Sequence, residues 1–212
     1  MPFYKKLLLL AALIVMSLTS ATSALAATAT ITGGPTVNGT ASTSTLFKNH
    51  TAGKTYSCTG SALNGTVSPS SSGSIPPGFR TGTLTPSFTG CNIVGGLGIT
   101  IVCQNDGWVI TGLTVAGNTP GAITGISCHL FVTAQTACRK HVVGSVGATF
   151  SNAAHSLIID VNHQNLSRIN STNGMGGTCS VLPNDPSARW VSPLNADLVF
   201  NVSPTNLTVN VS

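Results

Sequence analysis

The feature that most constrains the fold is a period-two alternation of apolar and polar residues within short segments. Asp197–Val202 and Asn206–Val211 each place an apolar residue at every second position. This spacing puts all the apolar side chains of a strand on one face. No window shows a sustained helical period. Many short strands separated by turn signals predict an all-β fold, either an antiparallel β-sandwich or a barrel.

The same pattern predicts where strands and loops lie. Val142–Phe150 and Ser156–Val161 are predicted to form a hairpin, because they flank a turn-forming Ser-Asn-Ala-Ala sequence. Val67–Gly78 is rich in Ser, Gly and Pro and is predicted to be a loop. Asn184–Asn195 contains two prolines and is predicted to be irregular.

The N-terminal residues have the pattern of a secretory signal. A basic start is followed by an apolar run of signal length at Leu7–Leu18, and Ala24-Leu25-Ala26 matches a small-x-small cleavage site. We expect residues 1–26 to be cleaved, with no membrane span remaining. Residues 27–54 are expected to be a weakly structured arm or a first strand. Residues 55–212 are expected to form a single all-β domain.

The charge of the chain excludes some partners. The segment after residue 26 holds seven Lys and Arg residues and four Asp, which gives a formal net charge of +3. These charges are scattered, whereas nucleic-acid binding needs basic residues concentrated on one face. We therefore expect no nucleic-acid partner. Such a low surface charge also permits self-association.

The cysteine content predicts a disulfide-stapled domain. Six cysteines follow the signal, and an even number in a secreted chain is typical of disulfides formed in an oxidising compartment. No C-x-x-C pair is present, so the sequence does not favour zinc. The number of cysteines leaves all pairings open. The six are Cys58, Cys91, Cys103, Cys128, Cys138 and Cys179.

A set of Cys- and Gly-containing segments resembles a known family. The runs PSFTGCNIVGGLGITI, GAITGISCHLFVTAQTAC, GATFSNAAHSLII, GGTCSVLPNDP and LVFNVSP are similar to the PraB-type alkane-oxidation activator proteins and related small secreted actinobacterial β proteins of unknown function. The resemblance covers roughly Thr55–Pro204. It implies an extracellular or cell-surface β protein linked to growth on hydrophobic substrates or to surface behaviour, and it carries no catalytic residues.

The resemblance also suggests how the cysteines pair. Family members typically have four cysteines, which correspond to Cys58, Cys91, Cys138 and Cys179. The remaining two cysteines would then form an additional pair. On this basis we expect the disulfides Cys58–Cys91, Cys103–Cys128 and Cys138–Cys179.

The sequence predicts no catalytic residues, metal ligands or cofactor. The nucleophile motif G-x-S-x-G is absent, and four isolated Asp residues do not favour a glycosidase. Asp160 could orient a histidine base for a Ser/His/Asp triad. In a chain with so many Ser and Thr residues, however, such a combination arises by chance and is weak evidence for a hydrolase. His155 and His163 are the histidines expected to approach each other, and two histidines without carboxylates are usually polar surface. The potential bases are His129, His141, His155 and His163.

These observations favour a secreted, non-enzymatic extracellular or cell-surface protein that interacts with hydrophobic substrates or surfaces. The alternative is a module that binds polysaccharide or lipid, and a secreted hydrolase ranks third. The possible ligand contacts are Trp108, Trp190, Phe79 and Phe131, although core packing is the favoured role for each of them. If exposed, the alternating C-terminal strands are expected to pair between chains.

Overall fold

The computed structural model describes residues 24–48, 55–93, 96–104, 106–133, 135–170, 179 and 184–212. These residues form strands and turns only. The strands are β1 (Leu25–Thr32), β2 (Thr36–Ala41), β3 (Thr45–Lys48), β4 (Thr55–Val67), β5 (Ser70–Ile75), β6 (Phe79–Ile93), β7 (Gly98–Cys103), β8 (Asp106–Ile110), β9 (Asn118–Val132), β10 (Gln135–Ser151), β11 (Ser156–Asn170), β12 (Asp185–Val191), β13 (Leu198–Ser203) and β14 (Thr208–Val211).

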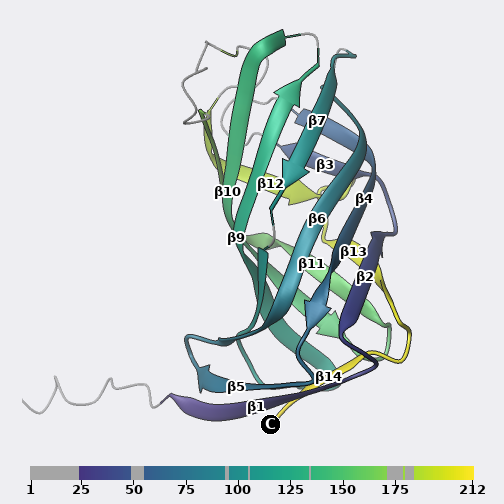
Figure 1. Cartoon of the computed structure of the whole chain (residues 1–212), viewed down its shortest axis with the longest axis vertical. Helices are drawn as coiled ribbons and strands as arrows, with labels where there is room; N and C mark the ends of the chain where they lie inside the picture. The colour runs from purple at the N-terminus through teal and green to yellow at the C-terminus, as the bar shows by residue number, and fades with distance from the viewer. Residues whose placement is uncertain are drawn as a thin grey trace, which may run out of the picture.

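The large sheet has eleven strands and closes on itself. Strand β4 pairs with β6, β6 pairs with β7 and β8, and both of these pair with β9. Strand β9 also pairs with β10, and β10 pairs with β11. Strand β11 pairs with both β12 and β13. Strand β12 pairs with β3, β13 pairs with β2, and both β3 and β2 pair with β4, which closes the sheet. All pairings are antiparallel. The predicted all-β sandwich or barrel is therefore confirmed, and the long strands enclose one core (Figure 1).

A second sheet of three strands, in the order β14-β1-β5, lies across the lower end of the large sheet (Figure 1). Its buried side chains include Ala29, Ile31, Val209 and Val211, and they belong to the same apolar cluster as the core of the large sheet. The small sheet thus covers one end of the core. This explains why an alternating segment as short as β14 is fully packed on one face.

The three disulfides have the expected pairing. Cys58–Cys91 joins directly opposed residues of β4 and β6, and Cys103–Cys128 does the same for β7 and β9. The third disulfide, Cys138–Cys179, ties β10 to the segment that precedes β12. Two of the three bridges therefore reinforce pairs of strands that already exchange backbone hydrogen bonds.

One segment decides between two predicted alternatives, and two other segments differ from the prediction. Residues 24–48 form β1, β2 and β3, so the all-β domain begins before residue 55, and the predicted cleavage point after Ala26 falls within β1. Val67–Gly78 was wrongly predicted to be entirely loop, because Ser70–Ile75 forms β5 and pairs with β1. Asn184–Asn195 was wrongly predicted to be irregular, because Asp185–Val191 forms β12 between β11 and β3.

A glycine at a β-bulge changes which face of β9 is buried. In β9, odd-numbered residues are buried before Gly125 and even-numbered residues after it, and Gly125 adopts a positive φ of 75°. An extra residue in one strand reverses the alternation of side chains beyond it. The bulge thus points Cys128 inward and His129 outward, which a strict period-two pattern through the whole strand would not do.

Candidate functional site on the outer face of strands β9 to β11

The aromatic residues selected from the sequence as possible ligand contacts are mostly in the core. Trp108, Trp190 and Phe79 are buried. The Trp190 ring packs at 6.0 Å from the Phe47 ring, measured between centroids. Large aromatic side chains contribute most to stability when their whole surface is removed from water. The three residues therefore pack in the core, which is the role that the sequence favoured for each of them. Of the four candidates, Phe131 is the one that lies on an outer face.

Phe131 lies on a continuous outer face formed by β9 and β10. Opposed residue pairs along this face run from Pro120 and Thr149 at the lower end to Phe131 and Arg139 at the upper end. The Arg139 guanidinium carbon is 5.3 Å from the centroid of the Phe131 ring. The residues of this outer face are Pro120, Ala122, Thr124, Ser127, His129 and Phe131 of β9, and Arg139, His141, Val143, Ser145, Gly147 and Thr149 of β10.

A row of four residues crosses the upper part of the outer face. The register places Val102 of β7 opposite His129, His129 opposite His141, and His141 opposite Ile169 of β11. We call these four residues the histidine row. The apolar ends are exposed, with 53% of Val102 and 39% of Ile169 accessible to solvent. The row therefore presents apolar side chains to solvent on both sides of two imidazole rings.

The two imidazoles of the row are stacked. Their ring centroids lie 4.4 Å apart, with an angle of 7° between the planes. The Nε2 atom of His141 also hydrogen-bonds to the Ser127 hydroxyl at 2.9 Å. Partial burial and then the neighbouring His129 lower the pKa of His141, which keeps its ring neutral at pH 7. Sequence spacing gave no sign of this pair, because it depends on the register of β9 against β10.

A shallow groove occupies the lower part of the same face. Its volume is about 380 Å³, and it is lined by Thr111, Pro120, Gly121, Gly147, Ala148, Thr149, Asp160 and His163. Gly147 allows the backbone of β10 to come close to β11 at this groove, because a Cβ atom at this position would lie only 2.8 Å from the Cβ of His163. The groove is thus open and contains only two titratable side chains.

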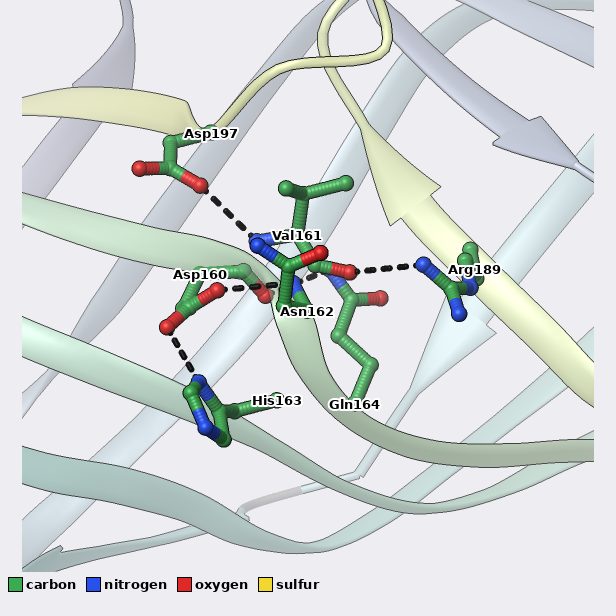
Figure 2. A network of polar contacts seen from close by, with 7 residues as sticks. All are labelled: Asp160, Val161, Asn162, His163, Gln164, Arg189 and Asp197. Carbon is green, nitrogen blue, oxygen red and sulfur yellow. Dashed lines mark hydrogen bonds and ion pairs between the residues drawn. The ribbon is translucent and has the colours of Figure 1, made fainter.

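Both titratable groups come from a bulge in β11, where four residues, 160–163, oppose Gly147 alone. Figure 2 shows how the bulge is held. The Asp160 carboxylate accepts a hydrogen bond from the Asn162 amide at 2.7 Å and contacts His163 Nδ1. The Asp197 carboxylate accepts a hydrogen bond from the Val161 amide at 2.9 Å. Side chains thus replace the strand partners that the bulge lacks.

The far side of the bulge is fixed to β12. Gln164 donates to the backbone oxygen of Trp190 and accepts from its amide, both at 2.7 Å. Arg189 donates to the backbone oxygen of Val161 at 3.1 Å (Figure 2). Here β11 leaves its partner β13 and joins β12. The network therefore allows one long strand to change neighbours, which is a structural role.

The Asp160–His163 pair has part of the geometry of a catalytic base, because a carboxylate orients the imidazole through Nδ1. However, 77% of the His163 side chain is exposed, and among the described residues no Ser or Thr hydroxyl hydrogen-bonds to its ring. His155, the histidine expected near His163, instead belongs to the β10–β11 turn. A nucleophile activated by this pair is therefore not part of the described structure.

The bulge in β11 also places the charged residue Arg168 in the core, and the sequence analysis did not predict this burial. Buried positions of β11 are odd-numbered before the bulge and even-numbered after it, so Arg168 points inward. It opposes buried Asp185 of β12, and its guanidinium carbon is 5.8 Å from the centroid of the buried Tyr56 ring. Burial raises the pKa of Tyr56. Nearby, buried Lys140 donates to Asn184 Oδ1 at 2.7 Å. Buried charges require such partners.

A second groove, of about 290 Å³, lies over β2, β4 and β6. Its lining is rich in hydroxyl groups and comprises Thr40, Ala41, Thr59, Gly60, Ser61, Ala62, Ser87 and Thr89. It contains no aromatic side chain. Within the described residues, no three His, Cys, Asp or Glu side chains gather as a group able to hold a metal ion.

Comparison of the chain with protein-family models, characterised proteins and solved structures finds no match. In the part of the chain that the structure describes, no helix has the length and apolar character needed to cross a membrane.

Proposed function

We propose that this protein is a non-enzymatic extracellular or cell-surface protein that attaches to hydrophobic substrates or surfaces through the histidine row and Phe131. The observation that carries the proposal is the exposure of Val102 and Ile169 at the two ends of the row. Exposed apolar side chains on one continuous face are typical of sites that contact other apolar surfaces. Burial lowers the pKa of His141, so its imidazole adds no charge to the row at neutral pH.

The disulfides support both the proposed extracellular location of the protein and the rigidity of this face. Three disulfides are consistent with an oxidising, extracellular compartment. Cys128 directly precedes His129, and Cys138 directly precedes Arg139. The Cys103–Cys128 bridge therefore braces β7 and β9, which carry Val102 and Phe131, and the Cys138–Cys179 bridge fixes β10 between β9 and β11. The predicted signal and the resemblance to PraB-type proteins support the same location and the same class of partner.

Among the large aromatic residues, the burial pattern favours an extended apolar partner over a sugar. Carbohydrate sites usually stack an exposed aromatic ring on the sugar, whereas the described Trp and Tyr residues, Trp108, Trp190 and Tyr56, are buried. A flat face with scattered aliphatic side chains is better suited to an alkane droplet or a lipid layer than to a single small ligand.

Binding of the purified, oxidised protein to hexadecane droplets tests the proposal. We expect the double variant Val102→Thr/Ile169→Thr to lose most of the droplet binding, because threonine preserves strand propensity while adding a hydroxyl group. The matched control is Leu194→Thr, which changes the most exposed large apolar residue of the described chain (88%), outside this face. Equal binding by the double variant and the wild type would overturn the proposal.

A polysaccharide-binding module is the second candidate, and the hydroxyl-lined groove over β2, β4 and β6 favours it. Insoluble polysaccharides and whole cells therefore form two further arms of the same experiment. Polysaccharide binding that survives in Val102→Thr/Ile169→Thr but weakens in Thr40→Val would establish this alternative. A hydrolase ranks behind both, because His163 lacks a hydroxyl partner among the described residues.

A further inference from the structure

We propose that His129 and His141 together form a binding site for one divalent transition-metal ion, with Cu²⁺ as the preferred ion. The site lies on the outer face between β9 and β10. This inference does not depend on attachment to hydrophobic surfaces, and it differs from the sequence prediction of no metal ligand.

The placement of the two rings is the first argument. His129 and His141 are directly opposed in an antiparallel pair and project from the same face, with ring centroids 4.4 Å apart. The Cβ atoms of directly opposed residues lie about 4.5–5.5 Å apart, which is within the span of two ligands to one ion. The terminal torsion of histidine is soft. The rings can therefore turn from stacking to converge on a metal without moving the backbone.

The second argument is the hydrogen bond of His141. When Nε2–H donates to the Ser127 hydroxyl, the lone pair of the ring lies on Nδ1 and is directed away from that bond. Metal-bound histidines usually donate their other ring N–H to an oxygen in this way, which fixes the tautomer and orients the ring.

The third argument is rigidity. The two strands stay in register from Arg139 to Gly144, on both sides of His141, and the disulfide Cys103–Cys128 is adjacent to His129. Two ligands on paired strands lose less conformational entropy on binding than two ligands on a loop, because their backbones are already fixed.

The ligand chemistry selects the class of ion. Imidazole nitrogen suits copper, zinc and nickel, whereas calcium and magnesium need oxygen ligands. Among the side chains that the structure describes, Asp160 is in the bulge, Asp185 is buried and Asp197 is in a loop, so none of them belongs to the histidine row. All six cysteines are in disulfides. For a site with two nitrogen ligands, affinity among the divalent ions rises to a maximum at Cu²⁺. Water would fill the remaining coordination positions.

Titration of the untagged, oxidised protein with Cu²⁺, followed by calorimetry and by electron paramagnetic resonance, tests the proposal. We expect one equivalent to bind, with a spectrum that shows coupling to two nitrogen ligands. His129→Ala and His141→Ala should each weaken binding at least tenfold, and the double variant should abolish it. Circular dichroism should confirm that each variant is folded. Ser127→Ala should weaken binding less than either histidine variant, by about tenfold or less.

The matched control is His163→Ala, which removes an exposed histidine from the same outer surface. Its affinity should equal that of the wild type. Binding of Cu²⁺ by the double variant with unchanged affinity would overturn the proposal, as would loss of binding in His163→Ala alone. Absence of binding to the wild type above the level of a buffer control would also overturn it. Droplet binding is measured without metal, so either proposal can fail while the other stands.

Discussion

At the scale of single residues, the β11 bulge shows how a few polar side chains determine a strand's course. Asp160, Gln164 and Asp197 satisfy backbone groups that have lost their strand partners. A buried or half-buried backbone group without a partner costs about as much as a lost hydrogen bond. These residues therefore provide the hydrogen bonds that a neighbouring strand would otherwise provide.

The carboxylate of Asp160 provides a pH-dependent test at this scale. The hydrogen bond from His163, followed by that from the Asn162 amide, holds the pKa of Asp160 below its ordinary value of 3.8. A depressed pKa in the folded state stabilises the fold above the ordinary value, and the stabilisation is lost as the pH falls through the folded-state pKa. Asp160→Asn should therefore be less stable than the wild type at pH 7, by no more than about 1 kcal/mol.

This difference should shrink as the pH falls from about 5 to about 2. Urea unfolding of both proteins across this range provides the measurement, because only the difference between them isolates Asp160 from other acid-labile groups. A difference that remained constant with pH would show that the lost interaction does not depend on the charge of the carboxylate.

At the scale of elements, the exposed edge of a sheet is where a strand could pair with another chain. The C-terminal strands were expected to pair between chains if exposed, but β13 lies between β11 and β2. Strand β14 pairs with β1 on one side only. On its other side, the Asn152 side chain accepts a hydrogen bond from the Val209 amide at 2.8 Å and donates to the Val209 oxygen at 2.9 Å. This edge is therefore covered by a side chain of the same chain at Val209.

Removal of the Asn152 side chain should reopen this edge. Asn152→Ala leaves the Val209 amide without its partner, whereas the Val209 oxygen keeps the hydrogen bond from the Thr119 hydroxyl. We therefore expect a loss of about 1–3 kcal/mol in the free energy of unfolding. We also expect a rise in self-association with concentration, measured by sedimentation velocity. Asn38→Ala, at an exposed position of β2, is the control and should remain unchanged. A monomeric and fully stable Asn152→Ala protein would contradict this account of the edge.

Strands β5 and β12 show why some elements escape prediction. β5 contains four serines in Ser70–Ile75, which locally favour a turn, yet it forms six residue pairs with β1. β12 begins with Asp185-Pro186, which local rules assign to a loop, yet its later residues Ala188, Trp190 and Val191 are buried. In both cases, hydrogen bonds to a distant strand outweigh a weak local preference.

At the scale of the whole molecule, the two sheets share one core, so they should unfold together. Val209 of the small sheet is fully buried in the cluster that also contains Trp108 and Trp190 of the large sheet. We expect Val209→Ala to reduce stability by roughly 2 kcal/mol, since it removes two buried methyl groups. The urea midpoint measured by tryptophan fluorescence should shift together with that measured by far-UV circular dichroism.

The control for this measurement is Val115→Ala, at a residue that is exposed, which should change stability by less than about 0.5 kcal/mol. An early loss of circular dichroism in Val209→Ala, while fluorescence remained native, would mean that the small sheet unfolds independently and that the core is not cooperative.

The sequence by itself determined the all-β class, the two C-terminal strands, the β10–β11 hairpin and an even set of disulfide cysteines. These depend on local alternation, turn residues and composition, which can be recognised within a short window. Only the tertiary structure decided the closure of the large sheet, the pairing of His129 with His141 and the burial of Arg168. Each depends on register between strands distant in sequence, and the bulges at Gly125 and at residues 160–163 reverse the buried face. A period-two pattern alone therefore cannot reveal which side chains meet.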